Sequence, residues 1–112
     1  MNDIRGDELR GHLETMVLSV LERGEAHGYE ILQRLESAGC GALKLKEGTL
    51  YPALYRLEEA GLVKGVWESG AESRRGPRRR NYRLTVAGKR QLARRRESWR
   101  NFVAVIGRIV EA

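Results

Sequence analysis

Hydrophobic residues recur at helical spacing through the first half of the chain. Apolar positions fall three or four residues apart over Asp7–Arg23, Gly28–Ser37 and Glu47–Ala60. Spacing of this kind places the apolar side chains on one face of a helix. Gly24 and Gly61 follow two of these stretches at the position of a C-terminal cap. The pattern therefore predicts three amphipathic helices.

The third stretch contains Pro52, which limits where its helix can begin. Proline lacks a backbone N–H, so it fits best in the first turn, where that donor has no partner within the helix. Thr49 is a favourable N-cap residue, and we expect it to cap this helix. With Leu50, Leu54 and Leu57 in the core, the opposite side would present a polar and aromatic face. That face comprises Thr49, Tyr51, Pro52, Tyr55 and Arg56.

The hydrophobic pattern changes in the second half of the chain. Leu62–Glu68 and Arg79–Leu84 are short and rich in β-branched and aromatic residues, and a Gly/Ser/Arg/Pro segment separates them. These runs predict a β-hairpin, and Leu43–Leu45 forms a further brief extended patch. Thr85 is suited to be the N-cap of a final helix over Val86–Val110. The apolar stripe of that helix comprises Leu92, Trp99, Phe102, Val103, Ile106 and Val110.

Size and composition exclude several classes of protein. The chain has 112 residues and 41% hydrophobic residues, which predicts one domain with a small core. Cys40 is the single cysteine, so no internal disulfide can form. The N-terminal residues MNDIRGDE do not resemble a secretory signal, and no apolar run reaches the ~18 residues of a membrane span. We therefore expect a cytoplasmic protein with no membrane partner.

Arginine is concentrated in one part of the chain. The segment from Arg74 to Arg100 holds eleven arginines and one lysine against one glutamate, a net charge of +11, so the other residues carry −5 of the overall +6. Seventeen of the 21 basic residues are arginine, whose planar guanidinium can grip phosphate or guanine at two points. This asymmetry indicates a polyanion partner. The alternative is a solvated basic helix face beside a disordered basic loop.

Three helices followed by a β-hairpin is the element order of a winged helix-turn-helix. The sequence thus predicts a mainly α fold with a β-hairpin wing, of the α+β class, extended by a long C-terminal helix. We expect a flexible N-terminus over 1–8, a DNA-binding winged domain over 9–85 and a dimerisation helix over 86–112. The third helix would enter the major groove of double-stranded DNA, with the wing alongside it.

The candidate DNA contacts form two groups. The first lies at and beyond the start of the third helix, where backbone amides and the helix dipole attract phosphate. It comprises Lys46, Gly48, Thr49, Tyr51, Pro52, Tyr55 and Arg56. The second is the hairpin loop, whose arginines would enter a narrow minor groove. It comprises Arg74, Arg75, Arg78, Arg79 and Arg80. The alternative role for Tyr51 and Tyr55 is packing.

Three strings of the sequence resemble the PadR family of bacterial transcriptional regulators. They are LRGHLETMVLSVLERGEAHGYEILQRL from Leu9, EGTLYPALYRLEEAGLV from Glu47 and YRLTVAGK from Tyr82, and the similarity extends from Leu9 to Phe102. The resemblance implies a winged-helix homodimer that represses transcription from a palindromic operator, with an effector that relieves repression in some members. The match to the family's GTLYPAL motif implies DNA contacts at Gly48, Thr49, Tyr51 and Pro52. The match to HGYEI implies a further DNA contact at Tyr29.

The last helix predicts a dimer on physical grounds as well. Its apolar stripe extends beyond a three-helix core and would expose too much apolar area in a monomer. Pairing about a two-fold axis would bury the stripe and present two third helices to two half-sites. The alternative is that this helix folds back on its own domain. The single C-terminal helix is similar to that of the short PadR subgroup.

The two tryptophans are expected to have different roles. The resemblance to short PadR members includes a tryptophan on the last helix, which here is Trp99. This resemblance implies that a small planar aromatic effector would stack on Trp99. The alternative is that Trp99 fills the core or the interface. We assign Trp67, on a wing strand, to packing.

No residues show the pattern of a catalytic or metal centre. His12 and His27 are the only histidines, and no Cys, His, Asp or Glu group repeats at metal-ligand spacing. We expect His27 to cap the second helix, and we expect neither a cofactor nor catalysis. Oxidant sensing by Cys40 would need an exposed, electropositively placed thiolate. Two other functions stay open, namely a protein-interaction module with only nonspecific nucleic-acid contact and an RNA-binding domain.

Overall fold

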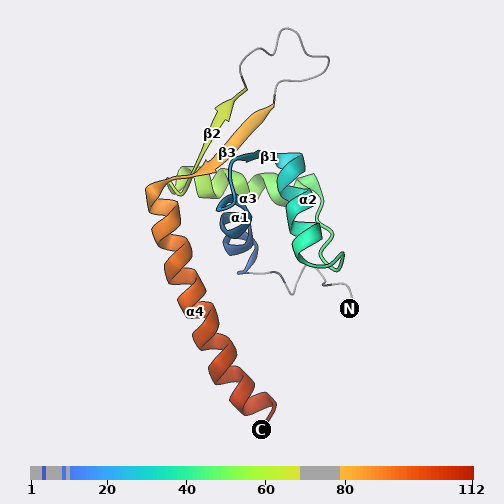
Figure 1. Ribbon diagram of the computed structural model, residues 1–112, viewed down its shortest axis with the longest axis vertical. Helices are drawn as coiled ribbons and strands as arrows, with labels where there is room; N and C mark the ends of the chain where they lie inside the picture. The colour runs from blue at the N-terminus through green and yellow to red at the C-terminus, as the bar shows by residue number, and fades with distance from the viewer. Residues whose placement is uncertain (1–3, 5–8, 10, 69–78) are drawn as a thin grey trace.

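Four helices and a three-stranded antiparallel sheet make up the computed structural model, which describes residues 4, 9, 11–68 and 79–112 (Figure 1). In chain order the elements are α1 (Leu13–Leu21), β1 (Ala26–His27), α2 (Gly28–Ala38), α3 (Glu47–Glu59), β2 (Val63–Trp67), β3 (Arg80–Leu84) and α4 (Val86–Val110). The predicted winged-helix order and the α+β class are confirmed. Of the segment expected to be flexible, 1–8, only Ile4 belongs to the described residues.

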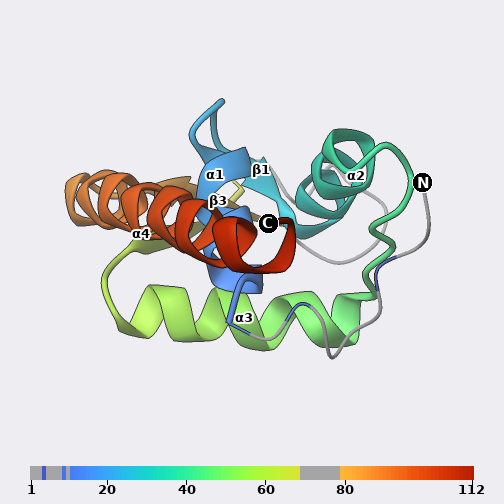
Figure 2. The same cartoon turned by 90° about the horizontal axis from the view of Figure 1, so that it is seen from below.

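Helices α1, α2 and α3 enclose the hydrophobic core. Leu18 of α1, Ile31 of α2 and Leu50 of α3 are completely buried, and Tyr82 and Leu92 close the core from β3 and α4. Helix α3 lies along one side of the domain, crossing beneath α1 (Figure 2). One face of α3 is therefore packed, and the other faces away from the domain.

Helix α1 begins later than the periodicity predicts. The expected helix covers Asp7–Arg23, whereas the structure has regular helix only over Leu13–Leu21. Gly11 adopts a φ of +85°, which lies outside the right-handed helical region. The chain therefore turns before α1, and the His12 N–H donates to the Leu9 carbonyl at 2.9 Å within that turn.

Helix α3 begins earlier than predicted, and the assignment of Thr49 as its N-cap is wrong. Lys46 is the N-cap, so Thr49 is the third residue of the helix and Pro52 the sixth. The Lys46 carbonyl accepts the backbone N–H of Thr49 and Leu50 at 3.0 and 3.1 Å, which closes the first turn. Pro52 removes the usual donor to the Gly48 carbonyl. Both residues are exposed, so water can satisfy that carbonyl and the helix continues through the proline.

The sheet is ordered β1-β3-β2, which places β3 in the centre. Strands β2 and β3 pair antiparallel along their whole length, as the predicted hairpin requires. On the other side of β3, the short strand β1 pairs Ala26 with Tyr82. This third strand was not predicted. The extended patch Leu43–Leu45 forms no strand.

The start of α4 is hydrogen-bonded to the turn that ends α3. Gly61, at φ +75°, terminates α3, and the Leu62 N–H donates to the Leu57 carbonyl at 2.9 Å. The Thr85 hydroxyl donates to the Gly61 carbonyl at 2.7 Å and accepts the Gly88 N–H at 3.0 Å. Thr85 is thus the predicted N-cap of α4, and it also joins α4 to α3.

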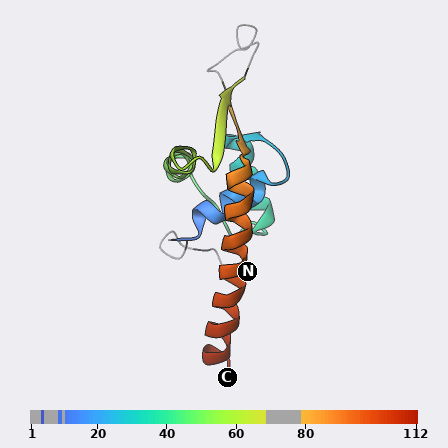
Figure 3. The same cartoon turned by 90° about the vertical axis from the view of Figure 1, so that its left-hand side faces the viewer.

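The two ends of the molecule point in opposite directions. Helix α4 has 25 residues, a length of about 37 Å. Its first half packs on α1 and β3, whereas its second half extends away from the domain, opposite to the hairpin (Figures 1 and 3). No helix within the described ranges is long and apolar enough to cross a membrane.

Candidate nucleic-acid interface

The outward face of α3 presents the residues that the sequence placed there. Tyr55 is 65% exposed and Tyr51 44% exposed, while Leu50 and Leu54 are buried. The two predicted faces of the helix are therefore confirmed. The exposed residues at and after its start include Lys46, Gly48, Thr49, Tyr51, Pro52, Tyr55 and Arg56.

Tyr51 combines packing with exposure. Its hydroxyl end lies against Gly28, the first residue of α2, and a Cβ on Gly28 would collide with that hydroxyl. Glycine at this position lets the phenol ring cross the start of α2. Tyr29, the next residue, is 61% exposed. The motifs HGYEI and GTLYPAL thus meet at one place, where Tyr51 lies against the start of α2.

His27 precedes α2 as its N-cap, as predicted. The Glu30 carboxylate accepts the His27 backbone N–H at 3.4 Å, and its Oε1 lies 2.8 Å from His27 Nε2. The same Nε2 lies 3.2 Å from Nη1 of Arg79, which directly precedes β3. The start of α2 and the start of β3 are therefore in contact through one imidazole ring.

The arginines predicted to contact DNA from the wing lie in different environments. Arg79 is exposed. Arg80 is not available to DNA in the same way, because its Nη2 donates to Oε2 of Glu58 at 2.6 Å and its guanidinium lies 5.5 Å from the Trp67 ring centroid. The assignment of Arg80 as a direct DNA contact stays a prediction, and this pairing with Glu58 competes with it. Arg74, Arg75 and Arg78 lie outside the described residues.

The basic residues near α3 are more accessible. Lys46 is exposed, and Arg56 is 57% exposed with its Nε 3.7 Å from Oε2 of Glu14. An ion pair between exposed groups at that distance contributes little to stability. Arg56 can therefore exchange Glu14 for a phosphate at small cost.

Two exposed basic residues of the wing were missed by the sequence reasoning. Lys64 of β2 and Arg83 of β3 are direct partners in the strand register, so two like charges lie opposite each other on one face. Such a pair is unfavourable in an isolated sheet and favourable beside a polyanion. The alternation of buried and exposed residues along β3 contained the signal. Arg83 directly follows the buried Tyr82 and therefore lies on the opposite, exposed face of the strand.

The second half of α4 presents the predicted apolar stripe to solvent. Trp99, Phe102, Val103, Ile106 and Val110 are between 41% and 74% exposed. Val105 and Ile109 are also exposed and were not in the prediction. Leu92 is the exception, because it is 1% exposed within the core of its own chain. We therefore remove Leu92 from the predicted dimer surface.

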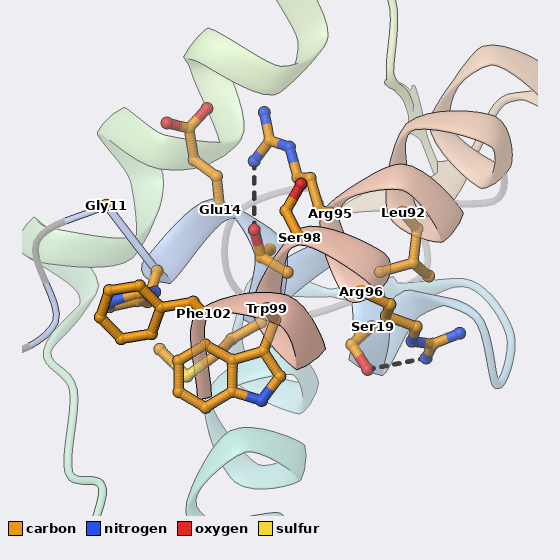
Figure 4. A pocket seen from close by; sticks show the side chains of 12 residues that line it. Gly11, Glu14, Ser19, Leu92, Arg95, Arg96, Ser98, Trp99 and Phe102 are labelled. Carbon is orange, nitrogen blue, oxygen red and sulfur yellow. Dashed lines mark hydrogen bonds between the residues drawn. The ribbon is translucent and has the colours of Figure 1, made fainter. Parts of the chain in front are cut away.

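A groove of about 780 Å³ runs between α1 and α4, beside the start of this stripe (Figure 4). Trp99 lies at one end of it, stacked on Phe102 with ring centroids 6.0 Å apart and in edge contact with His12 at 5.4 Å. Met16 and Leu92 contribute to the apolar lining. Trp99 is 50% exposed here, so an apolar molecule in the groove could contact its indole ring.

The opposite end of the groove is polar and already paired. Arg96 donates to both carboxylate oxygens of Glu22, at 2.9 and 3.1 Å, and to the Ser19 hydroxyl at 3.1 Å. The hydrogen bond from Arg96 holds the pKa of Glu22 below its ordinary value. Arg95 donates to the Thr15 hydroxyl at 3.4 Å. These contacts fix the first half of α4 on α1.

A helix with an exposed aromatic and polar face, beside a two-stranded basic wing, defines the class of winged-helix DNA-binding proteins. The model of the transcriptional regulator PadR-like family matches residues 17–94, and the chain belongs to this family.

Solved structures of transcriptional regulators agree with that assignment, and one curated sequence is similar to the chain. A transcriptional regulator from Clostridium thermocellum is 33% identical, with 96% of this chain and 98% of that chain covered and a TM-score of 0.84. A PadR family regulator from Eggerthella lenta is 32% identical over 95% of this chain and 88% of that one, with a TM-score of 0.80. A Lysinibacillus sphaericus protein called "Uncharacterized protein X" is 29% identical over 108 residues, 96% of each chain.

Proposed function

We propose that this PadR-family regulator is a homodimeric, non-catalytic repressor that binds a palindromic operator in double-stranded DNA. Residues 9–85 serve as the DNA-binding domain, with α3 as the recognition helix in the major groove and the wing on the flanking backbone. Residues 86–112 serve as the dimerisation helix. The observation that carries this proposal is the exposed face of α3, where Tyr55 is 65% and Tyr51 44% exposed and Lys46 and Arg56 are exposed as well.

The exposed half of α4 supports the homodimer. Its stripe consists of seven large apolar side chains that are each 41–74% exposed, a contiguous surface that monomeric proteins rarely leave in water. A second copy of the same helix is complementary to it, because a two-fold axis pairs like residues with like. The same axis would set two recognition helices against two half-sites.

The groove beside Trp99 supports regulation by a small molecule. A planar aromatic effector would stack on the exposed indole and enter the space between α1 and α4. Because this groove adjoins the proposed dimer seam, an occupant would change the angle between two protomers and hence the spacing of their recognition helices. Release from DNA follows when that spacing no longer fits the operator.

Selection of duplexes from a random pool tests the DNA-binding proposal. The purified protein should enrich one two-fold symmetric sequence and bind it about 10³-fold or more tightly than random DNA at physiological salt. Equal affinity for all duplexes would contradict it and favour a protein-interaction module. Stronger binding to the transcribed RNA of the same sequences would contradict it in favour of RNA binding.

Fluorescence tests the effector proposal. In a Trp67→Phe variant the emission comes from Trp99. The planar aromatic probe 2-naphthol should quench this emission, and the quenching should saturate as the probe concentration rises. A Trp99→Phe variant is the matched control, because it retains Trp67 and should show no saturable quenching. Equal quenching in both variants would contradict a binding site beside Trp99.

A further inference from the structure

Arg80 joins the recognition helix to both strands of the wing. Its Nη2 donates to Oε2 of Glu58, in the last turn of α3, at 2.6 Å and to the Gly65 carbonyl of β2 at 3.2 Å. The Gly65 N–H in turn donates to the same carboxylate oxygen of Glu58 at 3.4 Å. Three elements, α3, β2 and β3, thus meet at one carboxylate.

Aromatic rings hold the guanidinium in this place. The Arg80 Cζ lies 5.5 Å from the centroid of the Trp67 ring and 5.8 Å from that of Tyr82. The side chains of Arg80 and Glu58 are only 33% and 28% exposed. Partial burial reduces competition from water, so this pair is more specific in geometry than an ion pair on an open surface.

Gly65 makes the crossing of Arg80 possible. A Cβ at this position would lie 2.7 Å from Arg80 Nε and 2.9 Å from its Cζ, too close for the guanidinium to remain. Glycine within a strand weakens it, and it commonly marks a close approach of another group. Here the group that approaches is the side chain that reaches α3.

We propose that Glu58 and Arg80 are positioning residues, which fix the direction of the wing relative to the recognition helix so that both can meet one duplex. This inference rests on the proposed DNA-binding function. Strand β1 pairs only with Asn81 and Tyr82 of β3, and β2 is an edge strand of the sheet. Beyond that pairing the wing is a two-stranded ribbon, and ribbons of this kind twist readily. With the bridge in place, Lys64 and Arg83 keep a set position relative to Tyr51 and Tyr55.

A change in charge gives this proposal a test with a definite sign. Glu58→Gln removes a negative charge from a DNA-binding protein, and simple electrostatics predicts tighter binding to every duplex. A positioning role predicts the opposite for the selected duplex, a loss of about tenfold, while affinity for random duplex is unchanged or higher. Glu59→Gln, on the adjacent exposed carboxylate, is the matched control and should not weaken binding to the selected duplex.

Arg80→Lys provides the second variant. It keeps the charge but loses the planar fork that spans Glu58 and Gly65, so it should weaken binding to the selected duplex as Glu58→Gln does. The double variant should then be no weaker than either single one, because both remove the same bridge. Additive losses, or full affinity in Arg80→Lys, would overturn the proposal and return Arg80 to a direct phosphate contact.

A measurement without DNA separates this inference from the proposed function. Residual dipolar couplings of backbone amides report the orientation of β2 and β3 relative to α3 in the free protein. Glu58→Gln should change that relative orientation while each element keeps its internal couplings. If the wild-type protein selects no duplex, the proposed function fails and this readout still tests the bridge. Unchanged couplings in Glu58→Gln would overturn the bridge even if the wild-type protein selects an operator.

Discussion

Replacing Ile106 by aspartate should separate the proposed dimer into monomers. Ile106 is 41% exposed in the protomer and lies one helical turn from Phe102 and from Val110, on the stripe proposed to form the seam. In a two-fold interface the substitution places two carboxylates close together. The protomer itself should still fold, because this half of α4 extends beyond the domain.

The structure supplies the magnitude of this effect. Full burial of an isoleucine side chain contributes about 1.5–3 kcal/mol, so burying its exposed 41% contributes about 1 kcal/mol per protomer. A carboxylate taken into an apolar interface costs several kcal/mol per ion, or about 6 kcal/mol for the pair. The total of about 8 kcal/mol raises the dimer Kd by about six orders of magnitude.

Sedimentation equilibrium at micromolar concentration measures this change directly. Ile106→Asp should sediment as a monomer with the helical circular dichroism of a folded domain. Ala104→Asp is the matched control, because it adds the same charge two residues away, on the opposite face of α4, and should remain dimeric. A dimer of unchanged Kd in Ile106→Asp would refute the seam, as would equal dissociation in both variants.

Three further predictions concern stability and DNA affinity. Thr85→Val removes the N-cap of α4 and its bond to Gly61, and should lower the free energy of unfolding by about 2 kcal/mol in urea titrations; an unchanged midpoint would contradict it. Glu22, whose pKa the Arg96 hydrogen bond lowers from 4.5, stabilises the fold above that pH, and the contribution disappears as pH falls through the lower folded pKa. Thermal melts of Glu22→Gln should therefore differ from wild type at neutral pH and converge with it in acid, and a constant difference would refute this. Lys64→Gln combined with Arg83→Gln should flatten the salt dependence of DNA binding by about 3–4 units per dimer, and an unchanged slope would remove this pair from the interface.

Most of the fold follows from local patterns in the sequence. The final helix was bounded correctly because Thr85 has the chemistry of an N-cap and the apolar stripe continues to Val110. The hairpin follows from two β-rich runs on either side of a Gly/Pro segment. Strand β1 could not be predicted, because a two-residue strand has no periodicity of its own and forms only by pairing with β3.

The errors arose where tertiary context overrides a local rule. Pro52 is usual in the first turn of a helix, yet here it lies on the solvent side of α3, where a missing backbone bond costs little. Leu92 shares the stripe with Trp99, but periodicity cannot show that the domain covers one end of α4 and leaves the other exposed.

The pairing of Arg80 with Glu58 was not predicted, because composition cannot distinguish a paired arginine from a free one. The two-residue period of the strand did indicate which arginines share a face of the sheet. Arg80 is two residues from the buried Tyr82 and so points to the same face, whereas Arg83 points to the other. A cluster of arginines therefore has to be divided by strand face before its members are assigned to DNA.

The stoichiometry of the protein on its selected duplex shows whether it reads DNA as a preformed dimer. Native mass spectrometry should show two protomers on a duplex with both inverted half-sites and no accumulation of a one-protomer complex, because the dimer forms before it binds. A duplex with one half-site scrambled should bind far more weakly. A single protomer per duplex, or equal affinity for the intact and the scrambled duplex, would contradict the account of a two-fold regulator that reads DNA with paired recognition helices.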